Sequence, residues 1–328
     1  EQRPHGVSIA EIVARATAAG SGRDAGEEDK PWRDAYYEVM NAWRQMDTLV
    51  EWMRELVGGG ADAQLVVWDN TRFEVPWELF RHEDENAWLG ELISVIRWTT
   101  VHDGARSWTY SAPEHASTGG VLMYEDKELA VPADRFHRYE VVPRKTTMGQ
   151  LIRQLNDETV DFGLVVVRCH GKYSNDPRKM KLGGMPLIEF ADVRMAALRR
   201  NRAPVLLNAC VSARPVGVMP RSFAELFLRY GASAVIATVA EVGLNHSHEF
   251  AVRLLEKAEE GAVNIARALR DHRRAYAGPV RRDLGTDEDL RTEKDFELFF
   301  HGFMYVYFGH PGTTLRAIPQ NGGACGGD

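Results

Sequence analysis

Two apolar stretches decide how this chain folds: Asp-Phe-Gly-Leu-Val-Val-Val-Arg-Cys-His-Gly at residues 161–171 and Ala-Pro-Val-Leu-Leu-Asn-Ala-Cys-Val-Ser at residues 203–212. Each contains a short run rich in Val and Leu, which is typical of a strand buried on both faces of a parallel sheet. A loop rich in Gly, Pro and Lys over 171–186 and a predicted helix over 187–200 separate them. We therefore predict a strand–loop–helix–strand unit of an α/β fold.

Both predicted strands lead to a reactive side chain, His170 after the first and Cys210 after the second. Right-handed crossovers place the carboxyl ends of such strands at one edge of the sheet, where open α/β sheets bind their ligands. A thiol attacks well only as thiolate, and a neighbouring imidazole can take its proton and later protonate a leaving amine. We predict Cys210 as a nucleophile and His170 as its base, in preference to a structural cysteine and a core histidine.

The residues beside the pair have separate predicted roles. The missing side chain of Gly171 lets a substrate backbone come close, and its N–H, with that of Cys210, is a candidate oxyanion hole. Cys169 should point to the opposite face from His170, because side chains alternate along a strand, so we predict that it packs in the core. We predict no metal site, because these two cysteines and His170 lack a fourth ligand and a zinc-type spacing.

The two strand ends resemble those of the CHAT group of caspase-like cysteine proteases, in which one strand ends in His-Gly and the next in Ser/Asn-Ala-Cys. The resemblance extends to Val-Pro-Trp-Glu-Leu at 75–79, to the strand-like stretch 232–239 after Gly231, and to Tyr-Val-Tyr-Phe-Gly-His-Pro at 305–311. It covers about residues 62–316, with its motifs in the family's order. It implies a caspase-like three-layer α/β sandwich, in which a mostly parallel sheet is flanked by helices.

On this interpretation the chain has a helical N-terminal extension over 1–60 with a linker at 20–31, a protease domain over 61–318 divided into 61–118 and 119–318, and a disordered tail over 319–328. Apolar residues spaced by four and three over 31–57 predict one long helix with a heptad seam, which glycines at 58–60 end. The seam packs either on the protein's own sheet, the more common case, or on an activating partner or a second copy.

Four polar residues are candidates for substrate binding: Glu125, Asp126, Asn208 and Glu241. A carboxylate in the site would select Lys or Arg at the cleavage position through charge-assisted hydrogen bonds. Asn208 stands where some caspase-like relatives carry an acidic residue, so the preferred residue stays open, and each carboxylate has a solvated surface position as its alternative. The basic loop 172–181 is a candidate lid or contact for an acidic substrate segment, or else a solvated face.

Composition restricts the class of protein further. The net charge of −7 over 328 residues argues against a nucleic-acid binder, which would carry a basic face. We find neither an apolar run of about 20 residues that could cross a bilayer nor a signal-like start. Three cysteines make no disulfide framework, and a working thiolate needs a reducing compartment, so we expect a cytoplasmic protein. His246 and His248 are interpreted as solvated turn residues, with a metal pair as the alternative.

Residues and resemblance together predict a cysteine endopeptidase that needs no metal or organic cofactor. The resemblance also implies a regulated effector of a bacterial defence or cell-death system, with a dedicated protein substrate and an activating partner or fused sensor. Two alternatives stay open. One is a catalytically silent scaffold or binding module of the same family, and the other is a thiol amidase or acyltransferase that uses the same pair.

Overall fold

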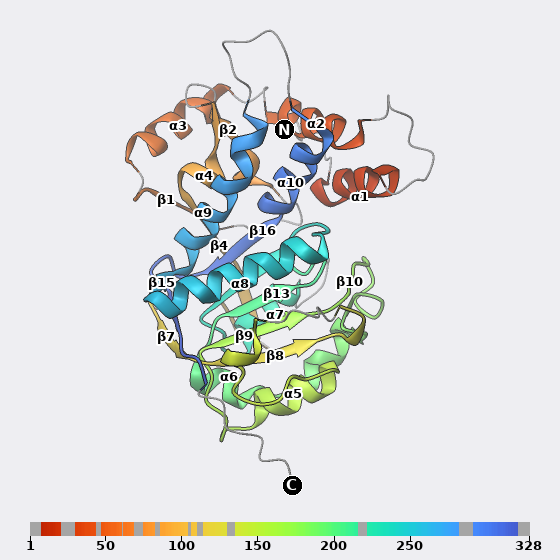
Figure 1. Ribbon diagram of the computed structural model, residues 1–328, viewed down its shortest axis with the longest axis vertical. Helices are drawn as coiled ribbons and strands as arrows, with labels where there is room; N and C mark the ends of the chain where they lie inside the picture. The colour runs from red at the N-terminus through yellow and green to blue at the C-terminus, as the bar shows by residue number, and fades with distance from the viewer. Residues whose placement is uncertain are drawn as a thin grey trace.

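The computed structural model describes residues 8–20, 30–43, 47–60, 62–68, 75–82, 86–103, 106–109, 114–129, 135–215, 222–281 and 291–320. A seven-stranded sheet lies at its centre, in the strand order β1-β4-β16-β14-β13-β9-β8 (Figure 1). These strands are β1 (Gln64–Trp68), β4 (Ser94–Trp98), β8 (Val121–Glu125), β9 (Leu164–Arg168), β13 (Val205–Asn208), β14 (Ala234–Thr238) and β16 (Tyr305–Gly309).

The sheet consists of two parallel blocks that meet at a single antiparallel pair. Strands β8, β9, β13 and β14 run in one direction. Strand β16 is antiparallel to β14 and parallel to β4, which is parallel to β1. The carboxyl ends of β8, β9, β13 and β14 therefore share one edge of the sheet, as the sequence predicted for the strands that precede His170 and Cys210.

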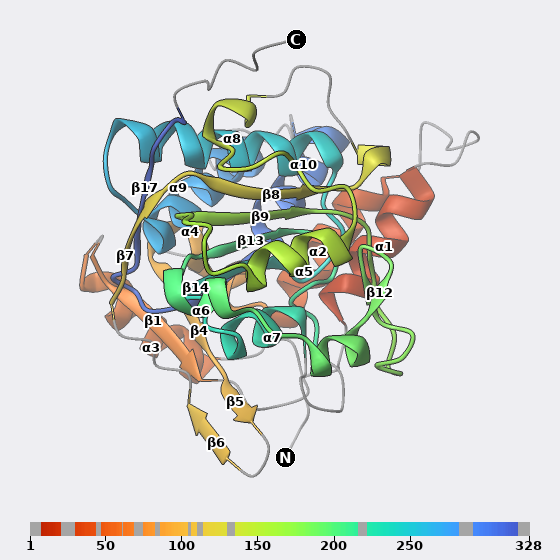
Figure 2. The same cartoon turned by 90° about the horizontal axis from the view of Figure 1, so that it is seen from below.

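Helices cover both faces of the sheet, which gives three layers (Figure 2). Helices α8 (Leu244–Glu260) and α9 (Ile265–Ala277) pack on the face that buries Leu164, Val166 and Leu206. Helices α5 (Met148–Asn156), α6 (Ala196–Asn201) and α7 (Phe223–Arg229) cover the face that buries Val165, Val167 and Leu207. Alternate residues of one strand thus enter opposite cores, which explains why these strands are apolar throughout.

Polar caps fix where several helices begin. The side chains of Thr147, Ser222 and Asn264 accept hydrogen bonds from backbone N–H groups in the first turns of α5, α7 and α9. Thr292 and Asp295 form a capping box at the start of α10 (Glu293–Phe303). Each cap satisfies an N–H that the helix itself leaves unpaired. Helix α10 was not among the elements that the sequence predicted.

The N-terminal extension differs from its prediction. The single helix expected over 31–57 is wrong, because α2 (Pro31–Trp43) and α3 (Asp47–Gly58) lie on different sides of the molecule (Figures 1 and 2). Residues 44–46 between them lie outside the described residues. The ring of Tyr36 lies 5.1 Å from that of Phe296 in α10 and 6.1 Å from that of Trp88. The described start of the seam therefore packs inside this protein, and mainly on α10 rather than on the sheet.

Helix α1 (Ile9–Gly20) completes the extension and lies against α2. It buries Ile9, Ile12 and Val13 in the same core as the sheet. Its Arg15 pairs with Glu38 of α2 at 2.8 Å. The extension is thus packed on the protein rather than separated from it, although the predicted linker falls mostly on residues outside the described part of the chain.

Short strands form the smaller sheets. They are β2 (Arg81–His82) with β3 (Ala87–Trp88), β5 (Thr100–Asp103) with β6 (Arg106–Thr109), β10 (Gly171–Lys172) with β11 (Lys181–Leu182) and β12 (Met185–Pro186), and β15 (Val263–Asn264) with β17 (Thr314–Ala317) and β7 (Ala116–Gly119). The basic loop after His170 is thus partly built into β10 and β11. The sequence predicts a last strand over 303–307 that closes the fold, and this is wrong, because β17 follows β16 in the chain and pairs with β15 and β7.

The remaining helical segments are short: α4 (Leu89–Leu92), η1 (Trp77–Leu79), η2 (Lys127–Leu129), η3 (His137–Tyr139), η4 (Leu187–Asp192) and η5 (Gly278–Val280). The helix predicted over 187–200 is interrupted, since η4 is a 3-10 helix and α6 starts only at Ala196. None of the described helices is both long enough and apolar enough to cross a bilayer.

The Pro-Trp-Glu-Leu segment contributes a carboxylate, that of Glu78, to a buried ion network. Glu78 of η1 is 1% exposed, pairs with Arg97 of β4 at 2.6 Å and lies 3.7 Å from Arg273 of α9. Arg273 also donates to the carbonyl oxygen of Tyr305 at 2.6 Å. Burial lowers the pKa of Arg273 to about 10, which leaves it charged at neutral pH. One carboxylate therefore joins η1, the sheet and α9.

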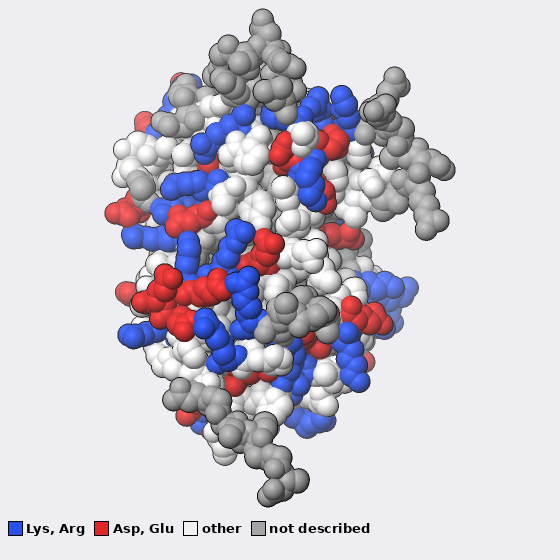
Figure 3. Space-filling view, in the orientation of Figure 1, with Lys and Arg blue, Asp and Glu red and all other residues white. Residues whose placement is uncertain are grey.

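The outer face of α8 carries ion pairs to the segment that covers the β8 edge. Arg135 pairs with Glu256 at 2.6 Å, and Arg138 pairs with Glu259. Figure 3 shows acidic and basic side chains intermixed over the visible face of the molecule, without one large patch of a single sign. These exposed pairs each contribute little to stability.

Candidate active site

Strands β9 and β13 deliver His170 and Cys210 to the same edge of the sheet. The two strands are parallel neighbours, and Arg168 at the end of one is in register with Asn208 at the end of the other. His170 and Cys210 each lie two residues beyond this matched pair. The N–H of Cys169 donates to the carbonyl oxygen of Asn208 at 3.4 Å, so the ladder continues one step past the strands.

The backbone that follows β9 contacts the backbone that follows β13 at Gly171. A Cβ built on Gly171 would lie 3.0 Å from the carbonyl carbon and 3.1 Å from the nitrogen of Cys210, and it would overlap the carbonyl oxygen. Only glycine fits such an approach. The histidine loop is therefore in direct backbone contact with the residue that carries the thiol.

The turn after the thiol is strained. Val211 has a φ of +54°, a conformation that is unfavourable for any residue with a Cβ and rare for a β-branched one. Hydrogen bonds hold the turn: Ser212 N–H donates to Ala209 O at 3.3 Å, and Ala213 N–H donates to Thr238 O at 2.9 Å. Such strain costs on the order of 1–3 kcal/mol and gathers at functional sites, so Val211 is an independent indication that this turn has a function.

The Cys210 thiol is partly buried and held protonated. Burial is the main cause that raises its pKa; the backbone N–H of Val242 lowers it, and the Glu241 carboxylate raises it. A thiol with a raised pKa is a poor nucleophile at neutral pH. In the described conformation, Cys210 is therefore mainly a neutral thiol at neutral pH.

The Glu241 carboxylate gives a first prediction. Glu241→Gln removes a negative charge near the sulfur, so the thiol pKa falls and the thiolate fraction at pH 7.5 rises. We expect iodoacetamide to alkylate Cys210 about two to three times faster, because an exposed charge acts weakly across water. Peptide mass spectrometry over a pH series measures the rate, and the exposed Glu189→Gln serves as control. An unchanged or slower rate would contradict the placement of Glu241 beside the thiol.

The imidazole of His170 is mostly exposed. Its side chain is 65% accessible, and its Nε2 lies 3.7 Å from a carboxylate oxygen of Glu128, itself 80% accessible. The Glu128 carboxylate therefore lies beside the ring without burying it. Cys169, in contrast, is 2% exposed, and burial raises its pKa strongly, which fits the packing role predicted for it.

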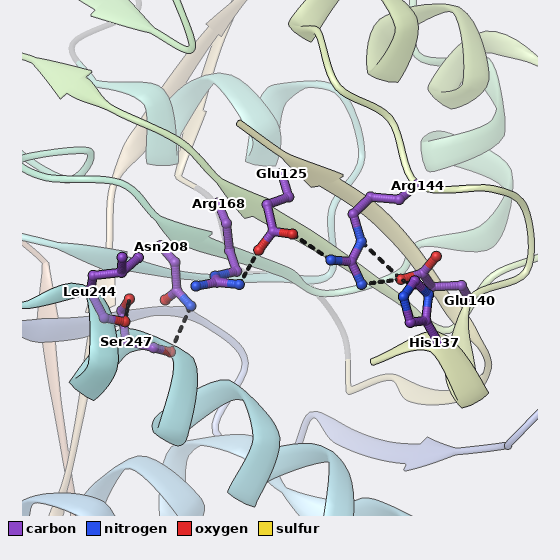
Figure 4. A network of polar contacts seen from close by, with 8 residues as sticks. All are labelled: Glu125, His137, Glu140, Arg144, Arg168, Asn208, Leu244 and Ser247. Atoms are coloured by element: carbon purple, nitrogen blue, oxygen red, sulfur yellow. Dashed lines mark hydrogen bonds and ion pairs between the residues drawn. The ribbon is translucent and has the colours of Figure 1, made fainter. Parts of the chain in front are cut away.

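Two of the predicted substrate-binding residues lie in a buried polar network (Figure 4). Glu125 is 3% exposed and accepts from both Arg168 and Arg144. Asn208 donates to Ser247 O at 2.9 Å and accepts from the Tyr305 hydroxyl at 2.9 Å. Both side chains are thus engaged inside the protein, and a substrate would have to displace these partners to reach them.

The other two predicted residues are more exposed to solvent. Asp126 is half-buried and close enough to Cys169 and Tyr124 to raise the pKa of both groups. Glu241 is exposed and raises the pKa of Cys210. Of the four candidates, Glu241 has the placement that best fits contact with a substrate.

The two histidines of α8 belong to the helix itself rather than to a turn before it. His246 stacks on His301 of α10 with ring centroids 4.6 Å apart, and the Nδ1 of His301 accepts from the N–H of Gly243 at 3.3 Å. In the part of the chain that the structure describes, no three His, Cys, Asp or Glu residues are arranged to hold a metal ion.

Sequence reasoning missed several residues of this region. The sequence does contain a signal for Arg168, because a charged residue that ends a run of three valines needs a buried partner. The left-handed turn at Val211 and the N–H donor of Val242 left no sequence signal, because both depend on backbone conformation. Arg144 comes from a segment that no predicted element included.

Comparison with known proteins leaves the family unassigned. No family model matches the chain, and no curated protein matches it either. What the structure defines is an α/β protein with a mostly parallel seven-stranded sheet and a Cys–His pair at one edge of it.

Proposed function

We propose that this chain is a cysteine endopeptidase of the CHAT caspase-like type, with Cys210 as nucleophile and His170 as base. The observation that carries the proposal is the backbone contact between Gly171 and Cys210 at the shared edge of β9 and β13. The motif resemblance and the strained turn at Val211 support it independently. On this proposal, the three layers form a caspase-like sandwich.

The reaction follows from the groups present. His170 takes the thiol proton, and the Cys210 thiolate attacks the scissile carbonyl carbon to give a tetrahedral oxyanion. The N–H groups of Gly171 and Cys210 hold that oxyanion. The C–N bond then breaks, the protonated His170 gives its proton to the leaving amine, and water hydrolyses the thioester to release the acid and the thiol.

The described conformation corresponds to a resting state of this enzyme. The thiol pKa is raised by burial and by Glu241, and the His170 ring is exposed. On this proposal, activation is a change that brings the imidazole to the sulfur. We propose that a protein substrate or an activating partner supplies it, in a regulated effector of a bacterial defence or cell-death system in the cytoplasm.

Two other functions compete with this proposal. The raised pKa of Cys210 also fits a catalytically silent scaffold, which would bind a partner and leave the thiol unused. A thiol amidase or acyltransferase would use the same Cys–His pair on a different carbonyl. The products separate the three, because only a peptidase leaves new protein termini.

The deciding experiment compares wild type with Cys210→Ala and His170→Ala in a lysate of the host, with new N-termini mapped by mass spectrometry. We expect at least one cleavage that only the wild type makes. Iodoacetamide labelling of Cys210 in the same lysate serves as a control for access to the thiol. A labelled Cys210 with no cleavage specific to the wild type would favour the scaffold, and acyl transfer or deamidation specific to the wild type would favour the other enzyme.

A further inference from the structure

The loops that follow the two catalytic residues are joined to each other. The guanidinium of Arg214 lies over the ring of Tyr173, 3.9 Å from its centroid. The Tyr173 hydroxyl lies 3.2 Å from the carbonyl oxygen of Pro215 and 2.8 Å from Oδ1 of Asn175, and its one proton can be donated to either oxygen. Tyr173 follows His170 by three residues, and Arg214 follows Cys210 by four. This contact therefore ties the histidine loop to the cysteine loop just beyond the site.

The same arginine reaches the N-terminal extension. Nη2 of Arg214 donates to Oε1 of Glu11 in α1 at 3.1 Å. The Arg214 side chain is 18% accessible, whereas Glu11 is 67% accessible. The arginine is thus held between an aromatic face and a carboxylate, an arrangement in which a planar guanidinium can use both its face and its edge.

Helix α1 can hold this position because the protein fixes it elsewhere. It buries Ile9, Ile12 and Val13 in the main core. The backbone of Glu11 is therefore held in place, which keeps its carboxylate within reach of Arg214. We call Tyr173, Arg214 and Glu11 the interloop bridge.

We propose that Arg214 is a positioning residue, which fixes the cysteine loop to the histidine loop, and that α1 supports it through Glu11. The proposal rests on the function proposed for Cys210 and His170. Its physical basis is that catalytic groups on two separate loops must stay within a fraction of an ångström of their working positions. The close backbone contact at Gly171 leaves no room for one loop to shift against the other.

The interloop bridge predicts that a substitution in either loop changes hydrogen exchange in both loops. If Arg214 fixes both loops, Arg214→Gln should increase hydrogen exchange not only in residues 211–215 but also in 171–176, which lie 40 residues earlier in the sequence. Tyr173→Leu should produce the mirror result. The double variant should resemble either single variant, because both substitutions remove the same contact.

The test measures hydrogen exchange and the iodoacetamide alkylation rate of Cys210 in the full chain. We expect the alkylation rate at pH 7.5 to rise about threefold or more in Arg214→Gln and Tyr173→Leu, because a loosened loop exposes the buried thiol. Arg214→Lys and Tyr173→Phe should show smaller changes in hydrogen exchange and alkylation rate. The same measurements can be made on these two variants if Arg214→Gln or Tyr173→Leu fails to fold. Glu11→Gln should show the same change in exchange, reduced, since its ion pair is exposed.

Arg15→Gln is the matched control. It breaks an ion pair of α1 with α2 and leaves Glu11 and Arg214 unchanged, so the exchange of 171–176 and 211–215 should stay as in the wild type. Exchange changes confined to the mutated loop, additive effects in the double variant, or equal changes in Arg15→Gln would overturn the proposal. None of these readouts needs a peptide substrate, so a failed cleavage experiment remains a separate result.

Discussion

Gly171→Ala should disable the site and destabilise the protein together. The added methyl would overlap the carbonyl oxygen of Cys210 and lie 3.0 Å from its carbonyl carbon, so one of the two loops must move. Overpacking of this kind costs about 1–3 kcal/mol of unfolding free energy. On the proposed peptidase function, a displacement of about 1 Å between the catalytic groups costs about a hundredfold in rate, so we expect at least that loss in the cleavage assay.

Urea denaturation and cleavage of the mapped substrate measure the two effects. Gly149→Ala is the matched control, since nothing lies within 4 Å of a Cβ at this position in α5. There the substitution should stabilise the protein by up to about 1 kcal/mol, because alanine is the better helix former. An unfolding free energy and a cleavage rate that both stay at wild-type values in Gly171→Ala would refute the close approach of the two loops.

Glu78→Gln should be the most destabilising of the substitutions considered. Glu78 is 1% exposed and is the carboxylate that faces both Arg97 and Arg273. The amide keeps the shape but removes the negative charge that faces the buried guanidinium groups of Arg97 and Arg273. Removing one partner of a buried ion pair costs about 3–5 kcal/mol, so we expect a loss in that range.

Equilibrium unfolding in urea measures this loss, and Glu38→Gln is its control. Glu38 pairs with Arg15 at the surface, where the two side chains are 38% and 65% accessible. An exposed pair contributes about 0–1 kcal/mol, so the control should change little. If Glu78→Gln lost no more than Glu38→Gln, the charge of Glu78 would not hold η1, β4 and α9 together.

The sequence predicted the strands of the central sheet well, because a strand buried on both faces is apolar at every position. Strands β9, β13 and β14 fall within the stretches read as strands. The order of the strands in the sheet could not be predicted from the sequence in the same way. The sequence predicts a last strand over 303–307 that closes the fold, yet β16 lies between β4 and β14 and runs antiparallel to β14. An apolar run indicates burial but not the neighbour that buries it.

Helix boundaries depended on contacts that the sequence does not display. The heptad spacing over 31–57 suits one long helix, but α2 docks through Tyr36 on the aromatic side chains of α10, and α3 lies elsewhere. Packing against Phe296 and its neighbours outweighed local periodicity, since most helical stability in proteins comes from tertiary packing. The helix α10 itself was missed, because its phenylalanines were not recognised as a buried face.

For the candidate site, the sequence determined the residue types and their place in the chain: a His-Gly and an Ala-Cys directly after two apolar strands. Only the tertiary structure decided what surrounds them. It buries Glu125 with Arg168 and Arg144, engages Asn208 through Ser247 and Tyr305, and sets Glu241 beside the thiol. Strand register follows from local pattern, whereas the protonation of Cys210 depends on burial and on charges from distant segments, which exist only once the chain has folded.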